Sequence, residues 1–188
     1  MDINTFFIGI LPVIVFVVLD SITTKKSAII SAVVLAFGEF LFTIIKYHTI
    51  DELTVLSVAL VVVFGWLSIK KGNDIYFKIQ PAILGLFFSA SFFFFYYILD
   101  KPLFNFMVEK YLDNDIGKYI PANIPKEYFM EMMRIMSRDL GWWILFHALL
   151  TAYAAFRMSK WWWFFIRVPF FYILLFIGML FEQRVVMQ

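Results

Sequence analysis

The chain has 188 residues, of which 63% are hydrophobic and only 16% are charged. Soluble domains are about half apolar and about a quarter charged, so this composition excludes an ordinary soluble fold with a polar surface. The net charge of +2 is too small for a nucleic-acid-binding protein. Because the sequence contains no cysteine, disulfides, thiolate nucleophiles and cysteine metal sites are also excluded.

Long apolar runs follow one another along the chain. A bilayer core about 30 Å thick takes about 20 apolar residues as a helix, with a range of about 17–25. Runs near this length cover residues 5–19, 27–45, 53–69, 79–99, 140–158 and 162–181. The first is short and contains Pro12, so whether it spans is left open. We predict an all-α, polytopic membrane helix bundle with five or six transmembrane helices, in a single integral membrane domain over residues 1–188.

The segment 100–139 is too polar to span, because it holds 13 of the 30 charged residues. After Pro125, apolar residues recur at the spacing of one helix face, namely Phe129, Met132, Met133, Met136 and Leu140. This predicts an amphipathic helix that either lies at the membrane surface or runs straight into the run 140–158. It is either a plain interfacial connector or a docking face for a partner.

Aromatic residues gather at the ends of the apolar runs. Tyr96 and Tyr97 close one run, and tryptophans open the next two, at positions 142–143 and 161–163. Indole and phenol rings prefer the headgroup level of a bilayer. We therefore expect these residues to mark the membrane interfaces.

Glu39 lies inside the apolar run 27–45, where a carboxylate is costly, so it needs a protected position. Ala28, Ala32 and Ala36 recur every four residues, and Glu39 falls within the arc that they define. Small residues in a row allow helices to approach closely, so Glu39 should face a neighbouring helix. Its carboxyl group either fixes packing or serves as a proton or substrate site.

His147 in the run 140–158 is a candidate polar partner for Glu39. With only two histidines in the chain, a zinc or di-iron centre is not expected. The sequence also lacks the G-x-S-x-G, phosphate-loop and H-E-x-x-H motifs. We therefore expect no catalytic, cofactor-binding or metal-binding residues, and no enzyme activity.

Asp74, Lys78 and Pro81 lie between the third and fourth runs, where Asn73 and Asp74 suit a turn followed by a helix start. The long side chain of Lys78 can extend to the lipid headgroups.

These residues also carry a resemblance. The segment Val61 to Gly65, followed by Gly72 to Pro81, resembles the pattern of the bacterial intracellular septation protein A family. Four positions match its acid, aromatic, lysine and proline, namely Asp74, Phe77, Lys78 and Pro81. Lys101 and Pro102 resemble the Lys-Pro-Leu segment of that family, whereas the connection after Lys110 is longer and more acidic than is usual there.

The resemblance implies a non-enzymatic, multi-pass protein of the bacterial inner membrane with a cytoplasmic C-terminus. It implies a role in cell division, septation and envelope maintenance, through contacts with division and elongation proteins. Membrane lipids are the other expected partners, and nucleic acid and cofactors are not expected. The alternative is a small transporter or lipid-handling protein with a polar path at Glu39 and His147.

Overall fold

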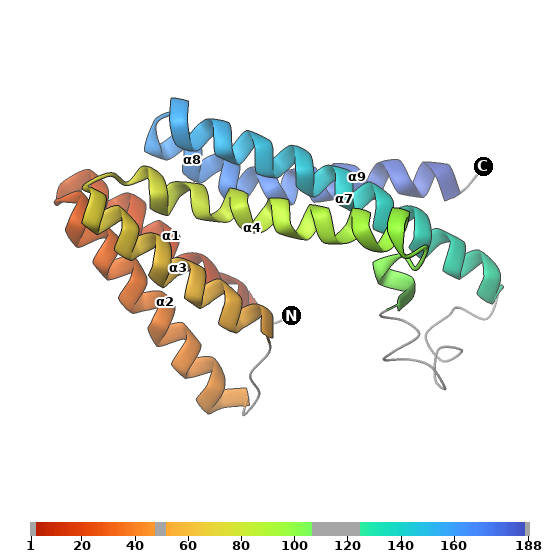
Figure 1. The fold of residues 1–188 in the computed structure, drawn as a ribbon, viewed down its shortest axis with the longest axis horizontal. Helices are drawn as coiled ribbons and strands as arrows, with labels where there is room; N and C mark the ends of the chain where they lie inside the picture. Colours follow the sequence, from red (N-terminus) through yellow and green to blue (C-terminus); the bar gives the residue numbers. More distant parts are fainter. Residues whose placement is uncertain (1–2, 48–51, 107–124, 187–188) are drawn as a thin grey trace. The chain divides into compact units, whose positions relative to one another are not determined.

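The computed structural model describes residues 3–47, 52–106 and 125–186, and the regular elements in these ranges are helices (Figure 1). The helices are α1 (Ile3–Ile22), α2 (Lys25–Tyr47), α3 (Glu52–Lys71), α4 (Ile75–Phe93), the π-helix η1 (Phe94–Ile98), α7 (Lys126–Arg157), α8 (Lys160–Arg167) and α9 (Pro169–Val186). The prediction of an all-α membrane helix bundle is confirmed. Within the described ranges, four helical stretches are long and apolar enough to cross a bilayer: Lys25–Ile45, Ile75–Ile98, Lys126–Arg157 and Lys160–Gly178.

Two predicted boundaries are settled by the structure. The amphipathic stretch after Pro125 runs straight into the apolar run 140–158, and together they form the single helix α7. The last run is not one uninterrupted helix, because α8 ends at Arg167 and α9 begins at Pro169. Proline has no N–H to donate and clashes with the preceding turn, which explains the break. The remaining predicted connection, residues 107–124, lies outside the described residues.

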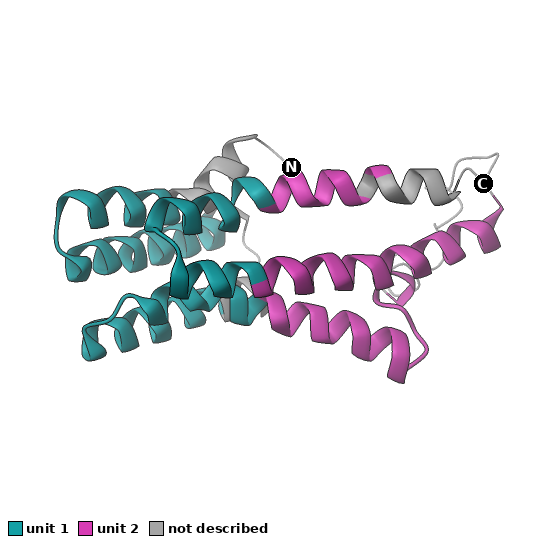
Figure 2. Ribbon diagram, turned by 90° about the horizontal axis from the view of Figure 1, so that it is seen from above, with its two compact units in different colours: residues 1–84, 150–170 teal, residues 85–149, 171–188 magenta. Residues whose placement is uncertain are grey.

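Contacts divide the chain into two compact units (Figure 2). Unit 1 comprises residues 1–84 and 150–170, and unit 2 comprises residues 85–149 and 171–188. The chain passes from one unit to the other within α4, within α7 and within α9. The single integral membrane domain over residues 1–188 stays a prediction.

The core of unit 1 is built around aromatic rings. Helix α2 packs against α1 and α3, and α1 also contacts α8. The ring of Phe16 in α1 lies 4.7 Å from Phe77 and 5.9 Å from Trp163, measured between centroids. Phe16 and Trp163 are fully buried, and each such ring removes about 150–250 Å² from solvent or lipid. Aromatic burial therefore ties the start of α4 and the short helix α8 to α1.

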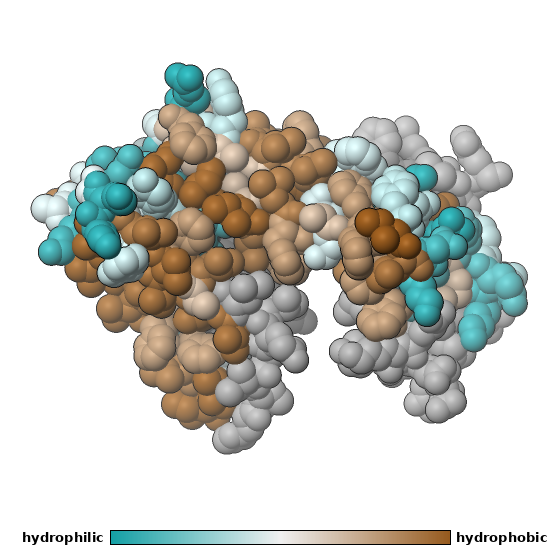
Figure 3. All heavy atoms as spheres, in the orientation of Figure 1, coloured by the Kyte–Doolittle hydropathy of each residue, from teal (hydrophilic) through white to brown (hydrophobic). Residues whose placement is uncertain are grey.

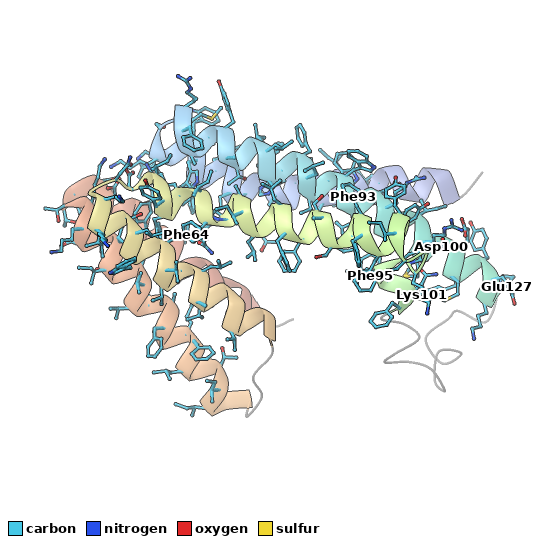
Figure 4. The ribbon with its side chains drawn as sticks, viewed as in Figure 1. Phe64, Phe93, Phe95, Asp100, Lys101 and Glu127 are labelled. Atoms are coloured by element: carbon cyan, nitrogen blue, oxygen red, sulfur yellow. The ribbon has the colours of Figure 1, made fainter. Side chains whose placement is uncertain are left out.

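Unit 2 is built around small residues where α4 meets α7. A Cβ atom added to Gly85 would lie 2.9 Å from the Cβ of Ala148, so the two helices nearly touch there. One turn further along α4, the Ser89 hydroxyl donates to the Gly141 carbonyl oxygen at 2.9 Å. In Figure 4, Phe93 marks the last residue of α4 and Phe95 lies in η1 beyond it. Small residues at a membrane helix contact permit this close approach.

Candidate functional site

The strongest polar site in the described part of the chain lies where three turns of unit 1 come together. These turns join α1 to α2, α3 to α4, and α7 to α8. We call its central group the Asp74 cluster, which consists of Lys25, Ser68, Asp74, Lys78 and Trp163. Figure 3 shows hydrophilic residues gathered at the end of unit 1 where the first two of these turns lie, beside apolar surface on α2 and α3.

The sequence between α3 and α4 dictates the turn that positions Asp74. Gly72 adopts a left-handed φ of 64°, a conformation that residues with a Cβ rarely take. Its N–H donates to the Ile69 carbonyl oxygen, and the N–H of Asn73 donates to that of Ser68, which together close α3. The Asn73 side-chain oxygen then accepts from the N–H of Ile75 at 3.0 Å and caps the start of α4.

Asp74 is therefore held at the N-terminus of α4, where the helix dipole favours a negative charge. One carboxylate oxygen accepts from the Lys25 ammonium at 3.0 Å, and the other pairs with the ammonium of Lys78 one turn along α4. The side chains of Asp74 and Lys78 are only 10% and 13% exposed. Burial alone would raise the pKa of Asp74, but the hydrogen bonds and charges of Lys78 and Lys25 outweigh it, and the pKa lies below its ordinary value.

The backbone around Asp74 is fixed by two further contacts. The Ser68 hydroxyl of α3 accepts from the N–H of Phe77 at 2.7 Å, which satisfies one of the free donors at the start of α4. The Trp163 indole N–H of α8 donates to the Lys78 carbonyl oxygen at 3.0 Å. Trp163 is fully buried against the protein, whereas Trp161 and Trp162 are 54% and 60% exposed, and the expectation that these tryptophans mark a membrane interface stays a prediction.

A second ion pair lies beside the cluster. Lys160, the first residue of α8, places its ammonium 3.0 Å from the Asp20 carboxylate of α1 and also donates to the Asp20 carbonyl oxygen. The Asp20 side chain is only 5% exposed. Asp20 thus links α1 to α8 through Lys160, and Asp74 links α2 to the start of α4 through Lys25.

The predicted motif positions are divided between unit 1 and unit 2. Asp74, Phe77 and Lys78 come together in unit 1, and Lys78 pairs with Asp74 rather than extending to lipid headgroups. Pro81 follows within the first two turns of α4. Lys101 and Pro102 belong to unit 2, where the N–H of Lys101 donates to the Phe95 carbonyl oxygen and Pro102 is buried. Figure 4 marks Lys101 beside Asp100, just after η1.

The predicted intramembrane residues are distributed differently. In α2, Ala28 and Ala32 are fully buried in the core of unit 1, whereas Ala36 and Glu39 are partly buried. One carboxyl oxygen of Glu39 is enclosed and has no hydrogen-bond partner among the described residues. His147 belongs to unit 2, where its ring lies 4.8 Å from that of Phe171. A pairing of Glu39 with His147 stays a prediction.

Several residues of the site were not identified as site residues from the sequence. Lys25 is 49 positions from Asp74, and Lys160 is 140 positions from Asp20, so no local pattern connects them. The role of Ser68 could not be recognised from the sequence, because serine is common at contacts between membrane helices. The one signal for Trp163 was its place in a Trp-Trp-Trp run, since three successive side chains of a helix cannot all face the same side.

The Asp74 cluster is suited to joining helix ends rather than to catalysing a reaction. Both Asp74 oxygens already hold ammonium groups, which leaves no free base or nucleophile at this carboxylate. Within the described ranges, no group of three or more His, Cys, Asp or Glu side chains is placed to hold a metal ion. The arrangement fixes the relative positions of the helix ends in unit 1.

Comparison with known proteins gives a distant relationship. The chain is 25% identical over 137 residues to the inner membrane-spanning protein YciB of Yersinia pestis (strain Pestoides F), which covers 71% of this chain and 74% of the relative. The same identity and coverage hold for the inner membrane-spanning protein YciB of Yersinia pseudotuberculosis serotype O:3 (strain YPIII). No family model matches the chain, and no solved structure matches it.

These relatives agree with the composition and the helices. Their name describes a protein that spans the inner membrane, and it names no enzymatic reaction. The structure supplies several apolar helices of spanning length. The chain is accordingly a multi-pass protein of the inner membrane.

Proposed function

We propose that the protein is a non-enzymatic inner-membrane component that supports cell division, septation and envelope maintenance by binding other membrane proteins of division and elongation. The observation that carries the non-enzymatic part is the Asp74 cluster. Its best-placed carboxylate is fully engaged by lysines and so acts in holding helices together. The likeness to inner membrane-spanning proteins and to the intracellular septation protein A pattern supports the cellular role.

The partners would bind laterally to helix faces that unit 1 and unit 2 each leave exposed. On α2, the Phe37 side chain is 47% exposed, and on α7 the Phe146 side chain is 52% exposed. Tyr128, near the start of α7, is 44% exposed on the amphipathic stretch. Large apolar side chains of this kind contact either lipid tails or a neighbouring membrane protein.

Site-specific photo-crosslinking in living cells tests this proposal. A photoreactive amino acid is placed at Phe37, Phe146 or Tyr128, and at the exposed Lys71 as a control outside these faces. Adducts from the three test positions should contain division or elongation proteins, identified by mass spectrometry, and the Lys71 control should not yield them. Adducts that contain only abundant unrelated membrane proteins would contradict the proposal.

The enclosed Glu39 favours a second candidate function, that of a small transporter or lipid-handling protein. A carboxyl group inside a membrane helix without a hydrogen-bond partner among the described residues is a common feature of proton and substrate paths. Substitution of Glu39 by Gln keeps the shape and removes the titrating proton. If cells that carry Glu39→Gln divide and grow as the wild type does, the proton-path function is rejected.

A further inference from the structure

A groove along α2 and α3 in unit 1 begins in a basic pocket and continues as an apolar channel. The pocket at the turn end has a volume of about 260 Å³ and is lined by Lys25, Lys26, Asn73, Asp74 and their neighbours, with the Asp74 carboxylate paired to Lys25 and Lys78. The channel next to it has a volume of about 190 Å³ and is lined by Ile30, Val33, Val34, Val62, Gly65, Trp66 and Ile69. Ile69 lines both cavities, so they adjoin.

The two helices present the same order of side chains along the groove. On α2, Lys26 is followed by Ile30 and Val34 at intervals of four residues, which places them on one helix face. On the antiparallel α3, Val62, Trp66 and Lys70 recur at the same interval. Lys26 lines the pocket at the turn end, and Lys70 lies one turn beyond Trp66 on the same face of α3, beside the groove rather than in its lining.

The floor of the channel is formed by a close helix contact. A Cβ atom added to Gly65 would lie 2.7 Å from Val33 and 3.5 Å from Ile29. Because Gly65 has no side chain, the larger side chains on either side project beyond the helix contact. Among them, Ile30, Val34 and Val62 are 43%, 63% and 42% exposed. An exposed channel of aliphatic side chains in a membrane-spanning helix pair fits a hydrocarbon chain.

The charges at the turn end are available to a ligand. Asp74 is already occupied by Lys25 and Lys78, and among the described residues neither Lys26 nor Lys70 forms an ion pair with a carboxylate. The Lys70 ammonium lies 4.7 Å from the centroid of the Trp66 ring, and both residue types favour the headgroup region at the end of a spanning helix. The N-terminus of α2, which begins at Lys25, adds partial positive charge to the pocket.

The dimensions agree with one leaflet of a bilayer. Lys26 and Val34 are eight residues apart, which is about 12 Å along a helix. Half of a hydrocarbon core is about 15 Å. We propose that this groove binds one anionic phospholipid, with the phosphate between Lys26 and Lys70 and an acyl chain along Ile30, Val34, Val62 and Trp66. The site does not depend on the proposed division role.

Native mass spectrometry of the full chain in detergent tests the headgroup end. Phosphatidylglycerol and phosphatidylcholine with the same acyl chains are titrated separately. The first phosphatidylglycerol should bind about 10- to 30-fold more tightly than phosphatidylcholine, since each lysine near a lipid headgroup contributes a severalfold gain. The double variant Lys26→Gln and Lys70→Gln should reduce the phosphatidylglycerol affinity to that of phosphatidylcholine.

A matched control removes two charges outside the groove walls of unit 1. Lys71 and Arg157 are exposed, line neither cavity and lie off the α3 face formed by Val62, Trp66 and Lys70. The double variant Lys71→Gln and Arg157→Gln should keep the wild-type affinity for phosphatidylglycerol within about twofold. An equal loss in both double variants, or equal affinities of the wild type for the two lipids, would overturn the proposal.

A second pair of measurements distinguishes a lipid from a free phosphate compound. Replacement of Val62 by Trp fills the channel and should weaken phosphatidylglycerol binding about tenfold while the lysines remain in place. Glycerol phosphate at millimolar concentration, which has the headgroup charge without acyl chains, should not displace the lipid. Displacement by glycerol phosphate, together with normal lipid binding by Val62→Trp, would show a headgroup-only anion site and reject the lipid.

Discussion

The helices within unit 1 and the helices within unit 2 are held together by different kinds of contact. In unit 1, charged side chains at the helix ends clasp α1, α2, α4 and α8 around Asp20 and Asp74, above a core of aromatic rings. In unit 2, α4 and α7 meet through Gly85, Ala148 and the hydrogen bond from Ser89 to Gly141. Charged side chains cost less free energy where a turn reaches water than within the hydrocarbon. Within the hydrocarbon, helices associate instead through close backbone approach and short hydrogen bonds.

The difference predicts which substitutions each unit tolerates. Unit 1 should be sensitive to loss of a charge at Asp74 and insensitive to a methyl group added at Gly38, although its close α2–α3 contact at Gly65 leaves no room for one. Unit 2 should lose stability when a methyl group is added at Gly85 and should change little when its exposed charge at Asp100 is removed. Unfolding of the purified chain in detergent, by heat or by sodium dodecyl sulfate, measures each of these responses.

The largest effect is expected for Asp74→Asn. It removes both ion pairs and leaves the nearly buried Lys78 ammonium without its counter-charge, which costs about 3–5 kcal/mol for a buried pair broken at one partner. The matched control is Asp100→Asn in unit 2, whose carboxylate is 87% exposed and lies 3.9 Å from Arg134. That control should change stability by less than about 0.5 kcal/mol. Equal losses in the two variants would refute the contrast between the units.

The next effect is expected for Gly85→Ala in unit 2. The added methyl group would lie 2.9 Å from the Ala148 Cβ, so α4 and α7 must separate, at a cost of about 1–3 kcal/mol. Gly38 in α2 is the control, because a Cβ there meets nothing within 4 Å. Gly38→Ala should stabilise by about 0.5–1 kcal/mol, through helix propensity alone. A stabilising Gly85→Ala would show that the two helices are not in close contact.

A smaller effect is expected for Ser89→Ala. It removes the buried hydrogen bond to the Gly141 carbonyl oxygen, and bonds of this kind between membrane helices are worth about 0.6 kcal/mol on average, up to about 1.7. Ser91 is the control, since its hydroxyl bonds only to the Phe87 carbonyl oxygen of its own helix. Ser91→Ala should be neutral within the error of the same unfolding measurement. A neutral Ser89→Ala would assign the α4–α7 contact to packing alone.

The smallest effect concerns pH and is confined to unit 1. The lysines lower the pKa of Asp74 in the folded protein, so its contribution to stability is complete above its ordinary pKa of about 3.9. That contribution is lost as the pH falls through the lower pKa of the folded state. The stability gap between the wild type and Asp74→Asn should therefore stay constant from pH 7 to pH 5 and narrow below about pH 4. A gap that widens on acidification would mean that burial dominates over the lysines.

Much of the architecture could be predicted from the sequence, because the bilayer imposes a simple length rule on apolar runs. The run 27–45 falls within α2, and the run 79–99 lies in α4 and η1 except for its last residue, Leu99. The break before Pro169 was missed, because the flanking apolar residues mask it in a count based on hydrophobicity. The direct entry of the amphipathic stretch into α7 was one of two alternatives that periodicity alone left open.

The candidate site could be predicted only in part. The turn at Asn73 and Asp74 follows from local residue chemistry, and the structure places both there. The partners Lys25 and Trp163 come from distant helices, and their contacts with the turn depend on packing that a single sequence does not encode locally. Lys78 was assigned to the headgroups because an isolated lysine favours water, but a carboxylate one turn earlier provides a nearer partner.

The pair between Asp20 and Lys160 has a consequence for biogenesis. The two residues are 140 positions apart, so at about 5–20 residues per second the ribosome needs roughly 7–28 s to supply the second after the first. Throughout that interval the nascent α1 carries an acidic end whose counter-ion has not yet been synthesised. A truncated chain that stops before α8 would lack Lys160 and would keep the Asp20 carboxylate without this partner.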